Sequence, residues 1–270
     1  MGQRKQTGSA CPEAVFITAR MGSTRLPGKH LLPVRGRPIL EYLMDRVREA
    51  DLPSCIVLCT TTLPEDDILQ EMAEKKDILV FRGHPTDILR RWLDAARAFR
   101  VEFIISAEGD DVFCDPECID RIIRRYRETG ADYLTCRGLP FGATPTGVRV
   151  QALETVCRLK IDDDTEGQQR YFTETGLFSL DTIEIRDPEL NRPEIRMTLD
   201  YPEDFQFFRE VISALFHGKE PVSLRDIIKY HDKHPEIVQI NQKMQKVYEK
   251  RFKKKYGKVR LGDQEGKEEV

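Results

Sequence analysis

Residues 14–29, AVFITARMGSTRLPGK, are the most informative stretch of this sequence. The apolar run at 14–18 is typical of a buried β-strand. The polar segment that follows, residues 19–29, contains two glycines, two hydroxyl side chains and the cations Arg20, Arg25 and Lys29. A strand that runs directly into a basic, glycine-containing loop is typical of α/β proteins, in which ligands bind beyond the carboxyl ends of parallel strands.

The rest of the chain repeats this alternation of apolar runs and helical patterns. Further strands are expected at 55–60, 78–81, 103–106, 133–136, 148–150 and 195–199. Helices are expected at 38–50, 64–76, 87–99, 116–129 and 202–216. Such regular alternation predicts an α/β fold with a mostly parallel central sheet and helices on both faces.

The sequence divides into three parts. Residues 1–12 are polar and are expected to be flexible, and residues 13–218 form the main domain. Residues 219–270 are expected to form a helical C-terminal extension, with helices at 222–231 and 235–256, and a charged tail. Residues 243–260 are rich in Lys and Arg, which indicates a solvated helix, with a partner-binding arm as the alternative.

Composition limits the class of protein. The chain has 270 residues, of which 40% are hydrophobic, enough for one large core. A formal net charge of −3 does not favour a nucleic-acid partner. No stretch approaches the roughly 20 apolar residues that would predict a membrane span. The seven cysteines contain no C-x-x-C pair, and no apolar run follows Arg4 and Lys5, so a cytoplasmic location is expected.

The loop after the first strand has the chemistry of a polyphosphate site. Gly22 and Gly28 allow the backbone to approach a ligand closely, and Ser23 supplies a hydroxyl. Together with the cations at 20, 25 and 29, they predict binding of a triphosphate. The loop is not a Walker A motif, because no G-K-[ST] follows at the required spacing. The alternative is a solvated basic turn.

Acidic residues follow two of the expected strands. Asp110 and Asp111 come after the strand at 103–106, and Mg²⁺ needs only one or two protein carboxylates besides phosphate and water. Asp110 is therefore a candidate metal ligand, whereas Asp115 is expected to cap the helix that starts at Pro116. Asp200 follows the expected strand at 195–199, and from the residues alone it could be a second metal ligand or a helix-entry residue.

Residues 20–29, RMGSTRLPGK, resemble the signature of the cytidylyltransferases that activate acidic sugars. That family includes the KDO and acylneuraminate enzymes and the spore coat polysaccharide biosynthesis protein F group. Further matches follow in order at 80–83, 87–91, 109–110 and 199–204, so the resemblance covers residues 13–216. It implies a nucleotide-diphospho-sugar transferase (Rossmann-like) fold for residues 13–218, and homodimers are common in the family.

The resemblance also implies a reaction. CMP would pass from CTP to a small acidic sugar with release of pyrophosphate, in surface polysaccharide or glycan biosynthesis. Arg20, Lys29 and Asp110 would be catalytic, and Asp110 and Asp200 would hold Mg²⁺. The remaining implied nucleotide-binding residues are Ala19, Gly22, Ser23, Arg25, Arg82, Asp87 and Arg91.

The sequence departs from the family pattern on the acceptor side. Pro140-Phe141-Gly142 is followed by Thr144 and Thr146 where acidic residues are usual, and Tyr171-Phe172-Thr173 replaces H-V-T. Two alternatives therefore stay open: a glycosyltransferase of the same fold that uses a preformed nucleotide sugar, and a non-catalytic nucleotide-binding homologue. No histidine is expected to act as a base.

Overall fold

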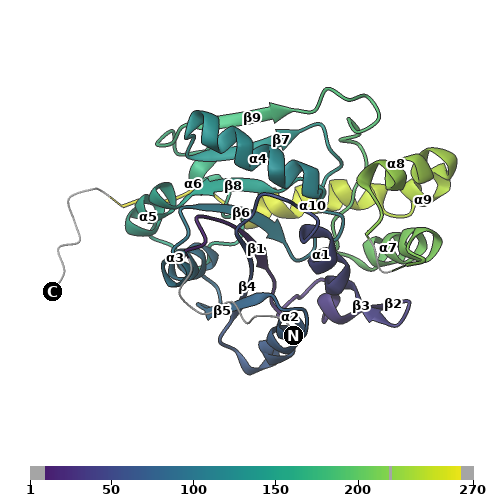
Figure 1. Cartoon of the computed structure of the whole chain (residues 1–270), viewed down its shortest axis with the longest axis horizontal. Helices are drawn as coiled ribbons and strands as arrows, with labels where there is room; N and C mark the ends of the chain where they lie inside the picture. The colour runs from purple at the N-terminus through teal and green to yellow at the C-terminus, as the bar shows by residue number, and fades with distance from the viewer. Residues whose placement is uncertain (1–9, 219–220, 263–270) are drawn as a thin grey trace.

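The first strand, β1 (Glu13–Thr18), lies inside a seven-stranded sheet in the computed structural model, which describes residues 10–218 and 221–262. The strand order is β5-β4-β1-β6-β8-β7-β9 (Figure 1). The other strands are β4 (Cys55–Thr61), β5 (Leu79–Gly83), β6 (Phe103–Glu108), β7 (Tyr133–Arg137), β8 (Thr146–Arg149) and β9 (Leu180–Glu184). Only β8 pairs antiparallel with its neighbours β6 and β7, so the predicted mostly parallel sheet is confirmed within the described residues.

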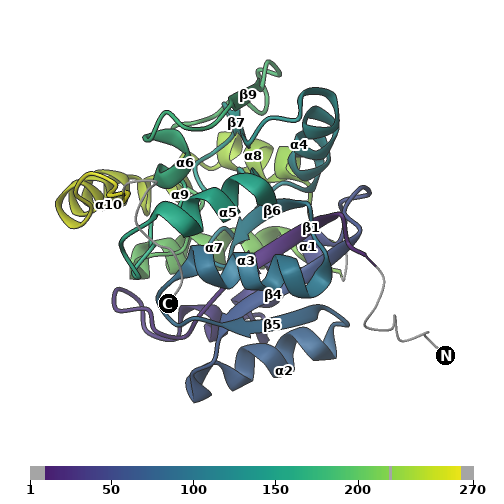
Figure 2. The same cartoon turned by 90° about the vertical axis from the view of Figure 1, so that its left-hand side faces the viewer.

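Helices cover both faces of the sheet, as predicted. The alternating side chains of β1 enter two separate cores, Val15 and Ile17 on one face and Ala14 and Phe16 on the other. The first face is covered by α1 (Ile39–Val47), α2 (Asp67–Lys75), α4 (Pro116–Thr129) and α7 (Pro202–Leu215). The second is covered by α3 (Ile88–Phe99) and α5 (Val150–Leu159), which lie in front of the sheet in Figure 2.

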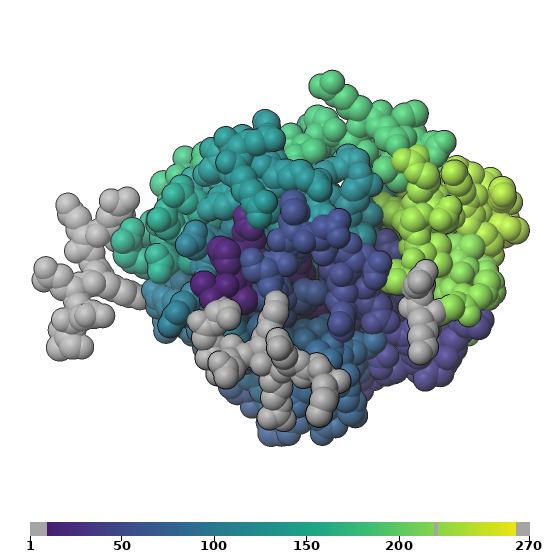
Figure 3. Space-filling view, viewed as in Figure 1, coloured from purple at the N-terminus to yellow at the C-terminus, as the bar shows by residue number. Residues whose placement is uncertain are grey.

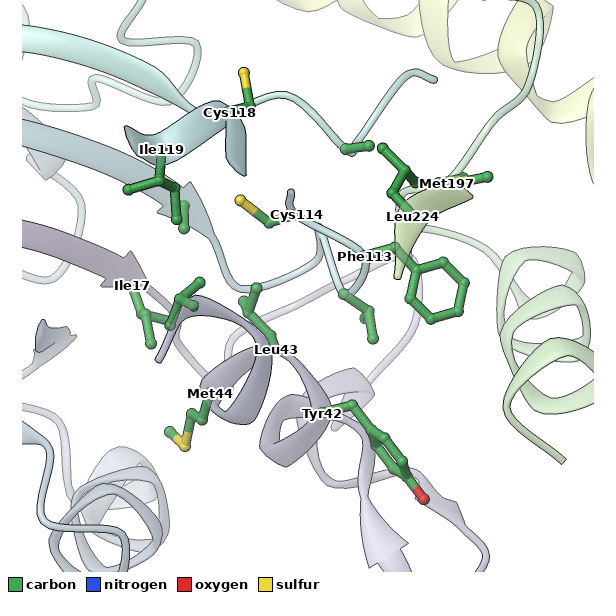
Figure 4. Close-up of a cluster of buried hydrophobic side chains, with 14 of the residues drawn as sticks. Ile17, Tyr42, Leu43, Met44, Phe113, Cys114, Cys118, Ile119, Met197 and Leu224 are labelled. Atoms are coloured by element: carbon green, nitrogen blue, oxygen red, sulfur yellow. The ribbon is translucent and has the colours of Figure 1, made fainter. Parts of the chain in front are cut away.

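The larger core joins segments that are far apart in the chain. Figure 4 shows Ile17 of β1, Leu43 and Met44 of α1, and Leu224 near the C-terminal helices within one buried cluster. The remaining short elements are the 3₁₀ helices η1 (Lys29–Leu31) and η2 (Pro64–Asp66), helix α6 (Arg170–Thr173), and the hairpin of β2 (Pro33–Val34) and β3 (Arg37–Pro38). The buried cluster in Figure 4 therefore connects β1 and α1 with the C-terminal helices.

The C-terminal segment packs onto this same core. It contains α8 (Leu224–Lys233), α9 (Pro235–Gln239) and α10 (Gln242–Lys255), and Ile227, Ile228 and Ile237 are buried in the cluster. In Figure 3 the green-to-yellow residues lie directly against the blue and teal surface of the first half of the chain. A flexible segment is expected at 1–12, and its residues 1–9 lie outside the described residues. A charged tail is expected within 219–270, and residues 263–270 lie outside the described residues as well.

The prediction of a single helix at 235–256 is wrong, because the helix is interrupted between α9 and α10. Asn241 lies at the interruption and is buried. Its amide nitrogen donates to the carbonyl of Arg196 at 3.2 Å and to Asp204 Oδ1 at 2.9 Å. These tertiary hydrogen bonds hold Asn241 outside helical geometry and set the direction of α10.

The strand expected at 195–199 is also absent from the described structure. The segment is extended, and only Arg196 forms an isolated bridge, with Phe141. It runs past the 140–143 turn, where Gly142 has φ of 93° and a Cβ atom would lie 2.4 Å from the carbonyl oxygen of Met197. This close backbone approach replaces a sheet ladder. The sequence patterns did not predict β9, α5 or α6.

Two further features concern side-chain chemistry. The sulfur atoms of Cys118 of α4 and Cys136 of β7 face each other, a contact that the cysteine spacing did not predict. Asp115 accepts a hydrogen bond from the backbone of Cys118, which confirms its predicted role as the cap of α4. None of the helices in the described part of the chain combines the length and apolarity needed to cross a bilayer.

Candidate active site

The pairing of β1 with β6 brings two predicted motifs to one edge of the sheet. Thr18 at the end of β1 lies opposite Glu108 at the end of β6 in a parallel ladder. The loop at 19–29 and the acidic segment at 109–111 therefore leave the sheet side by side. Gly109 makes this possible, since a Cβ atom there would lie 2.8 Å from Ala19 Cβ and 2.9 Å from the carbonyl oxygen of Thr18. This is the point in a doubly wound sheet where ligands bind.

The loop at 19–29 lines a small cavity of about 170 Å³. Its predicted nucleotide-binding residues all contribute to the lining: Ala19, Arg20, Gly22, Ser23, Arg25 and Lys29. The loop is held from both sides, because the backbone nitrogen of Met21 donates to buried Asp66 at 2.7 Å and Arg20 donates to the carbonyl of Pro85 at 3.1 Å. The loop cations are thus gathered around one cavity of a size suited to phosphate groups.

Lys29 connects the loop to both candidate metal ligands. Its Nζ lies 2.7 Å from Asp110 Oδ2, 3.5 Å from Asp200 Oδ1 and 3.0 Å from the carbonyl oxygen of Leu199. Burial alone would lower the pKa of Lys29, but the Asp110 and Asp200 carboxylates outweigh it and raise that pKa. The same contact lowers the pKa of Asp110 against the opposing effect of burial. The two aspartates therefore meet around one ammonium group.

Asp200 is oriented by two arginines and by the backbone. Arg25 donates to its Oδ1, and Arg196 Nη2 lies 3.2 Å from its Oδ2. The neighbouring backbone nitrogen of Leu199 donates to the carbonyl of Asp110 at 2.9 Å, which joins the two acidic segments directly. Burial and the Asp110 charge raise the pKa of Asp200. Asp200 thus lies beside Lys29 and Asp110 at the candidate site, although the strand expected to carry it is absent from the described structure.

The donor set fits a divalent cation that shares its shell with a substrate. Among residues 10–218 and 221–262, no group of three or more His, Cys, Asp or Glu side chains is arranged to hold a metal by itself. Asp110 and Asp200 offer two carboxylates beside the cationic loop. Mg²⁺ commonly takes one or two carboxylates and completes its octahedral shell with phosphate oxygens and water.

Arg91 of α3 supplies a buried, unpartnered cation. Its side chain is 1% exposed and lines the small cavity. Within the described structure, its Nε and Nη1 atoms have no hydrogen-bond partner. Burial and the nearby Arg20 charge lower the pKa of Arg91, and the Glu108 and Asp66 charges only partly offset this effect. A buried guanidinium without a partner is unfavourable, so this group has the chemistry of an anion ligand.

Glu108 stands between the small cavity and a larger one, and the sequence patterns did not single it out. Its Oε1 accepts from Ser106 Oγ at 2.8 Å and from Gln168 Nε2 at 2.7 Å. Burial, together with the nearby Asp110 charge, raises the pKa of Glu108 to about 7. Its charge therefore changes near neutral pH.

The larger cavity has a volume of about 560 Å³, and Asp110, Asp111 and Asp200 form its acidic floor. The segments that depart from the family pattern also line it, through Phe141, Gly142, Thr144, Thr146 and Phe172. Helix α10 and the residue that follows it contribute Tyr248, Arg251, Phe252, Lys255 and Tyr256. Asp110 belongs to the walls of both cavities, so a ligand in each would meet at this carboxylate.

Comparison with known proteins decides the family. A family model described as cytidylyltransferase matches residues 14–259. The chain belongs to the cytidylyltransferase family. It is 32% identical over 234 residues to the spore coat polysaccharide biosynthesis protein SpsF of Bacillus subtilis, covering 82% of this chain and 94% of that protein. The resemblance first seen in residues 20–29 is confirmed.

Two further relatives agree. A solved cytidylyltransferase from Leptospira borgpetersenii has a TM-score of 0.74 and 30% identity, and covers 85% of this chain and 97% of that one. The 3-deoxy-manno-octulosonate cytidylyltransferase of Rhodospirillum centenum is 28% identical over 124 residues, which cover 45% of this chain and 48% of that enzyme. The solved structure supports the predicted nucleotide-diphospho-sugar transferase fold.

Two residues implied by the resemblance are not among those that line the two cytidylyltransferase cavities. Arg82 on β5 donates to the carbonyls of Thr61 and Leu63 and pairs with Asp67 at 2.5 Å. Asp87 caps α3 and pairs with Lys160 at 2.5 Å. Both side chains are engaged in structural contacts, in contrast to Arg91 on the next turn of α3.

A buried histidine lies at the rim of the loop. His30 is 3% exposed and lines the small cavity of this cytidylyltransferase. Burial and the neighbouring Lys29 charge lower the pKa of His30 to about 3. The ring is therefore neutral near pH 7. That no histidine acts as a base stays a prediction.

The sequence reasoning missed the contribution of the C-terminal helix to the cytidylyltransferase site. Its Lys- and Arg-rich composition indicated a solvated helix, and its outer side is indeed exposed. The signal that could have revealed the inner side is the spacing of Tyr248, Arg251, Phe252 and Lys255. Positions i, i+3, i+4 and i+7 lie on one helical face.

Proposed function

We propose that this cytidylyltransferase transfers CMP from CTP to a hydroxyl group of a small acidic sugar. The observation that supports this most directly is the meeting of Lys29, Asp110 and Asp200 where the two cavities join. The small cavity has the cations that a triphosphate requires, and the larger one has room for an acceptor. The acidic-sugar class comes from the 3-deoxy-manno-octulosonate cytidylyltransferase among the relatives.

The reaction is an in-line displacement. The acceptor oxygen attacks the α-phosphorus of CTP, a new P–O bond forms, and the bond to the β-phosphate breaks. Pyrophosphate leaves with the electron pair of that bond, and the hydroxyl proton is lost to solvent or to a neighbouring carboxylate. The protein contributes mainly by positioning the reactants and neutralising charge. Arg20, Lys29 and Arg91 line the cavity where charge develops on pyrophosphate.

Asp110 and Asp200 would hold Mg²⁺. A bound Mg²⁺ would supply Lewis acidity for the phosphate oxygens and the acceptor hydroxyl. Residues of the chain position these two carboxylates. Arg196 and Arg25 orient Asp200, and Lys29 pairs with Asp110 beside it. Removal of divalent ions with EDTA should abolish turnover, and Mg²⁺ should restore it.

Three wider statements belong to this proposal. The protein acts in surface polysaccharide or glycan biosynthesis, in the cytoplasm, and forms a homodimer. The relation to SpsF of Bacillus subtilis supports the first of these. Light scattering coupled to size-exclusion chromatography measures the oligomeric state directly.

The deciding experiment measures pyrophosphate release by the purified chain. CTP and UTP are each combined with 3-deoxy-manno-octulosonate, N-acetylneuraminate and related sugar acids in the presence of Mg²⁺. Release that depends on both CTP and an acid supports the proposal. Asp110→Asn should abolish it, whereas Asp115→Asn, the same change at the cap of α4, should not. CTP binding without release across the panel would reject catalysis.

A further inference from the structure

Helix α10 presents one face to the larger cavity and the other to solvent. Tyr248, Arg251, Phe252 and Lys255 line the cavity, and their spacing places them on one side of the helix. In Figure 2, α10 lies at the left of the molecule, apart from the helices α3 and α5 that cover the near face of the sheet. The basic helix is therefore also a wall of the site.

Arg196 connects α10 to Asp200, one of the acidic residues that line the larger cavity. Its Nη1 donates to Gln245 of α10 at 3.0 Å, and its guanidinium carbon lies 5.4 Å from the centre of the Tyr248 ring. The same guanidinium pairs with Asp200 and Asp204. The ring of Phe141 lies 5.5 Å from that of Tyr248 and links α10 to the 140–143 turn. The position of α10 is thus coupled to that of Asp200.

The cations that line the larger cavity differ in their partners. Arg25 pairs with Asp200, Arg137 pairs with Glu184 at 3.0 Å, and Lys255 pairs with Glu166. The side chain of Arg251 alone among them forms no ion pair or hydrogen bond with any other described residue. Its guanidinium is exposed at the cavity wall. A fork-shaped donor of this kind matches the geometry of a carboxylate.

The charge of the floor sets the direction in which an acid can bind. Asp110, Asp111 and Asp200 repel a second carboxylate, so an acidic acceptor is expected to turn its acid group away from them. Helix α10 offers Arg251 to the cavity from the same side of the helix as the aromatic rings of Tyr248 and Phe252. Such rings can cover the apolar face of a sugar. This orientation leaves a hydroxyl group toward Asp110.

From this arrangement we infer that Arg251 binds the carboxylate of the acceptor and selects acidic over neutral sugars. The inference rests on the proposed function, because it names the group that recognises the second substrate. Arg251 also borders the small cavity, where the phosphates of CTP are an alternative anion. Binding measurements on each substrate separately distinguish the two.

The test uses the single tryptophan of the full-length chain as a reporter. Trp92 lines the larger cavity, and its fluorescence should respond to ligands there. Wild type, Arg251→Gln, Arg251→Lys and Lys253→Gln are each titrated with 3-deoxy-manno-octulosonate, N-acetylneuraminate, their methyl esters and CTP. Lys253 is the matched control, because it is exposed on the opposite side of α10.

Arg251→Gln should raise the Kd of the acids at least tenfold, equivalent to about 1.4 kcal/mol, and leave the Kd of CTP within about twofold. The methyl esters should bind wild type and Arg251→Gln equally weakly. Arg251→Lys should recover part of the affinity for the acids, and Lys253→Gln should behave as wild type. Melting temperatures near that of wild type show that the variants are folded.

Two results would overturn the inference. One is a loss confined to CTP binding in Arg251→Gln, which would assign the residue to the nucleotide. The other is equal affinity of wild type for acids and their esters, whether or not pyrophosphate is released. Selective loss of acid binding without pyrophosphate release from wild type would instead keep the inference and reject the proposed transfer reaction.

Discussion

Buried Lys29 and partly buried Asp110 form an ion pair, with Nζ 2.7 Å from Oδ2, although they belong to loops that follow different strands. The pair exists because β1 and β6 are adjacent and parallel, so their carboxyl ends meet. Asp200 joins the pair from the segment that precedes α7, at 3.5 Å from the same ammonium group. The Lys29 ammonium group therefore lies between the acidic residues of the larger cavity and the basic loop that lines the smaller one.

Replacing Lys29 with Met should lower kcat/KM for CTP at least tenfold, which corresponds to roughly 1.4 kcal/mol of lost transition-state stabilisation. The change removes a cation from the phosphate cavity and leaves two neighbouring carboxylates without their shared partner. Steady-state pyrophosphate release measures the effect. Lys75→Met is the control, since Lys75 is exposed and pairs only with Glu71 at 4.0 Å. Equal kcat/KM values for Lys29→Met and Lys75→Met would instead support the alternative that the loop at 19–29 is a solvated basic turn.

Arg91→Met should stabilise the free protein and weaken CTP binding at the same time. The buried guanidinium lacks partners for Nε and Nη1 within the described residues, and an unsatisfied buried group costs roughly 1–3 kcal/mol. Methionine fills similar space without that penalty. Urea denaturation measures the gain, and CTP titration the loss.

The neighbouring arginine provides the control for this trade-off. Arg90 is exposed and pairs with Asp94 at 2.9 Å, so Arg90→Met should change stability by less than about 1 kcal/mol and leave CTP affinity unchanged. A less stable Arg91→Met variant with normal affinity for CTP would contradict the anion-binding role of Arg91.

The raised pKa of Glu108, about 7, predicts a pH-dependent effect of Glu108→Gln on stability. Between the ordinary pKa of a glutamate and about pH 7, the folded wild type binds the proton more tightly than the unfolded chain. The contribution of this group to stability therefore falls as pH rises through that window. Glutamine resembles the protonated form at every pH. The advantage of Glu108→Gln over wild type should grow by roughly 2 kcal/mol between pH 5 and pH 8. Parallel urea titrations at the two pH values measure it, and a constant difference would rule out the raised pKa.

The loop at 19–29 and Asp110 could be predicted from local sequence patterns. The loop at 19–29 and Asp110 each follow a strong apolar run directly, so the rule that ligands bind at strand ends locates them without knowledge of the fold. The same rule suggested Asp200 for a wrong reason, since the segment before it is extended but belongs to no strand ladder. Its position depends on contacts with Phe141 and Asp110 that no local pattern encodes.

The C-terminal wall was not predictable in the same way. Lys and Arg side chains are common on solvated helix surfaces, so composition alone cannot distinguish a solvated face from one that borders a cavity. The direction of α10 is set at Asn241, whose buried amide bonds to Arg196 and Asp204. These are long-range hydrogen bonds between polar residues, and hydrophobic periodicity carries no information about them.

Asp204 is the residue on which this long-range arrangement depends most. Its carboxylate accepts from Arg196 Nε at 2.9 Å, from Asn241 Nδ2 at 2.9 Å, and from the backbone nitrogens of Asp200 and Tyr201, each at 2.9 Å. It is fully buried and lies outside the lining of both large and small cavities. Asp204→Ala should destabilise the protein by roughly 3–5 kcal/mol, because it leaves a buried arginine with one remaining carboxylate partner.

The same variant should lose activity even under conditions where it is folded, because Arg196 orients Asp200 and α10 together. Urea denaturation and pyrophosphate release at low temperature separate the two effects. Glu203→Ala is the matched control: the Glu203 side chain is 33% exposed and lies 3.8 Å from Lys243, so its removal should change stability by less than about 1 kcal/mol. Replacing both members of the buried pair, in Arg196→Met with Asp204→Leu, should recover only part of the stability, because Asn241 and the backbone nitrogens of Asp200 and Tyr201 still lose their acceptor. The activity should not recover, since no cation would then hold Asp200 Oδ2. Full activity in that double variant would show that Asp200 needs no support from Arg196.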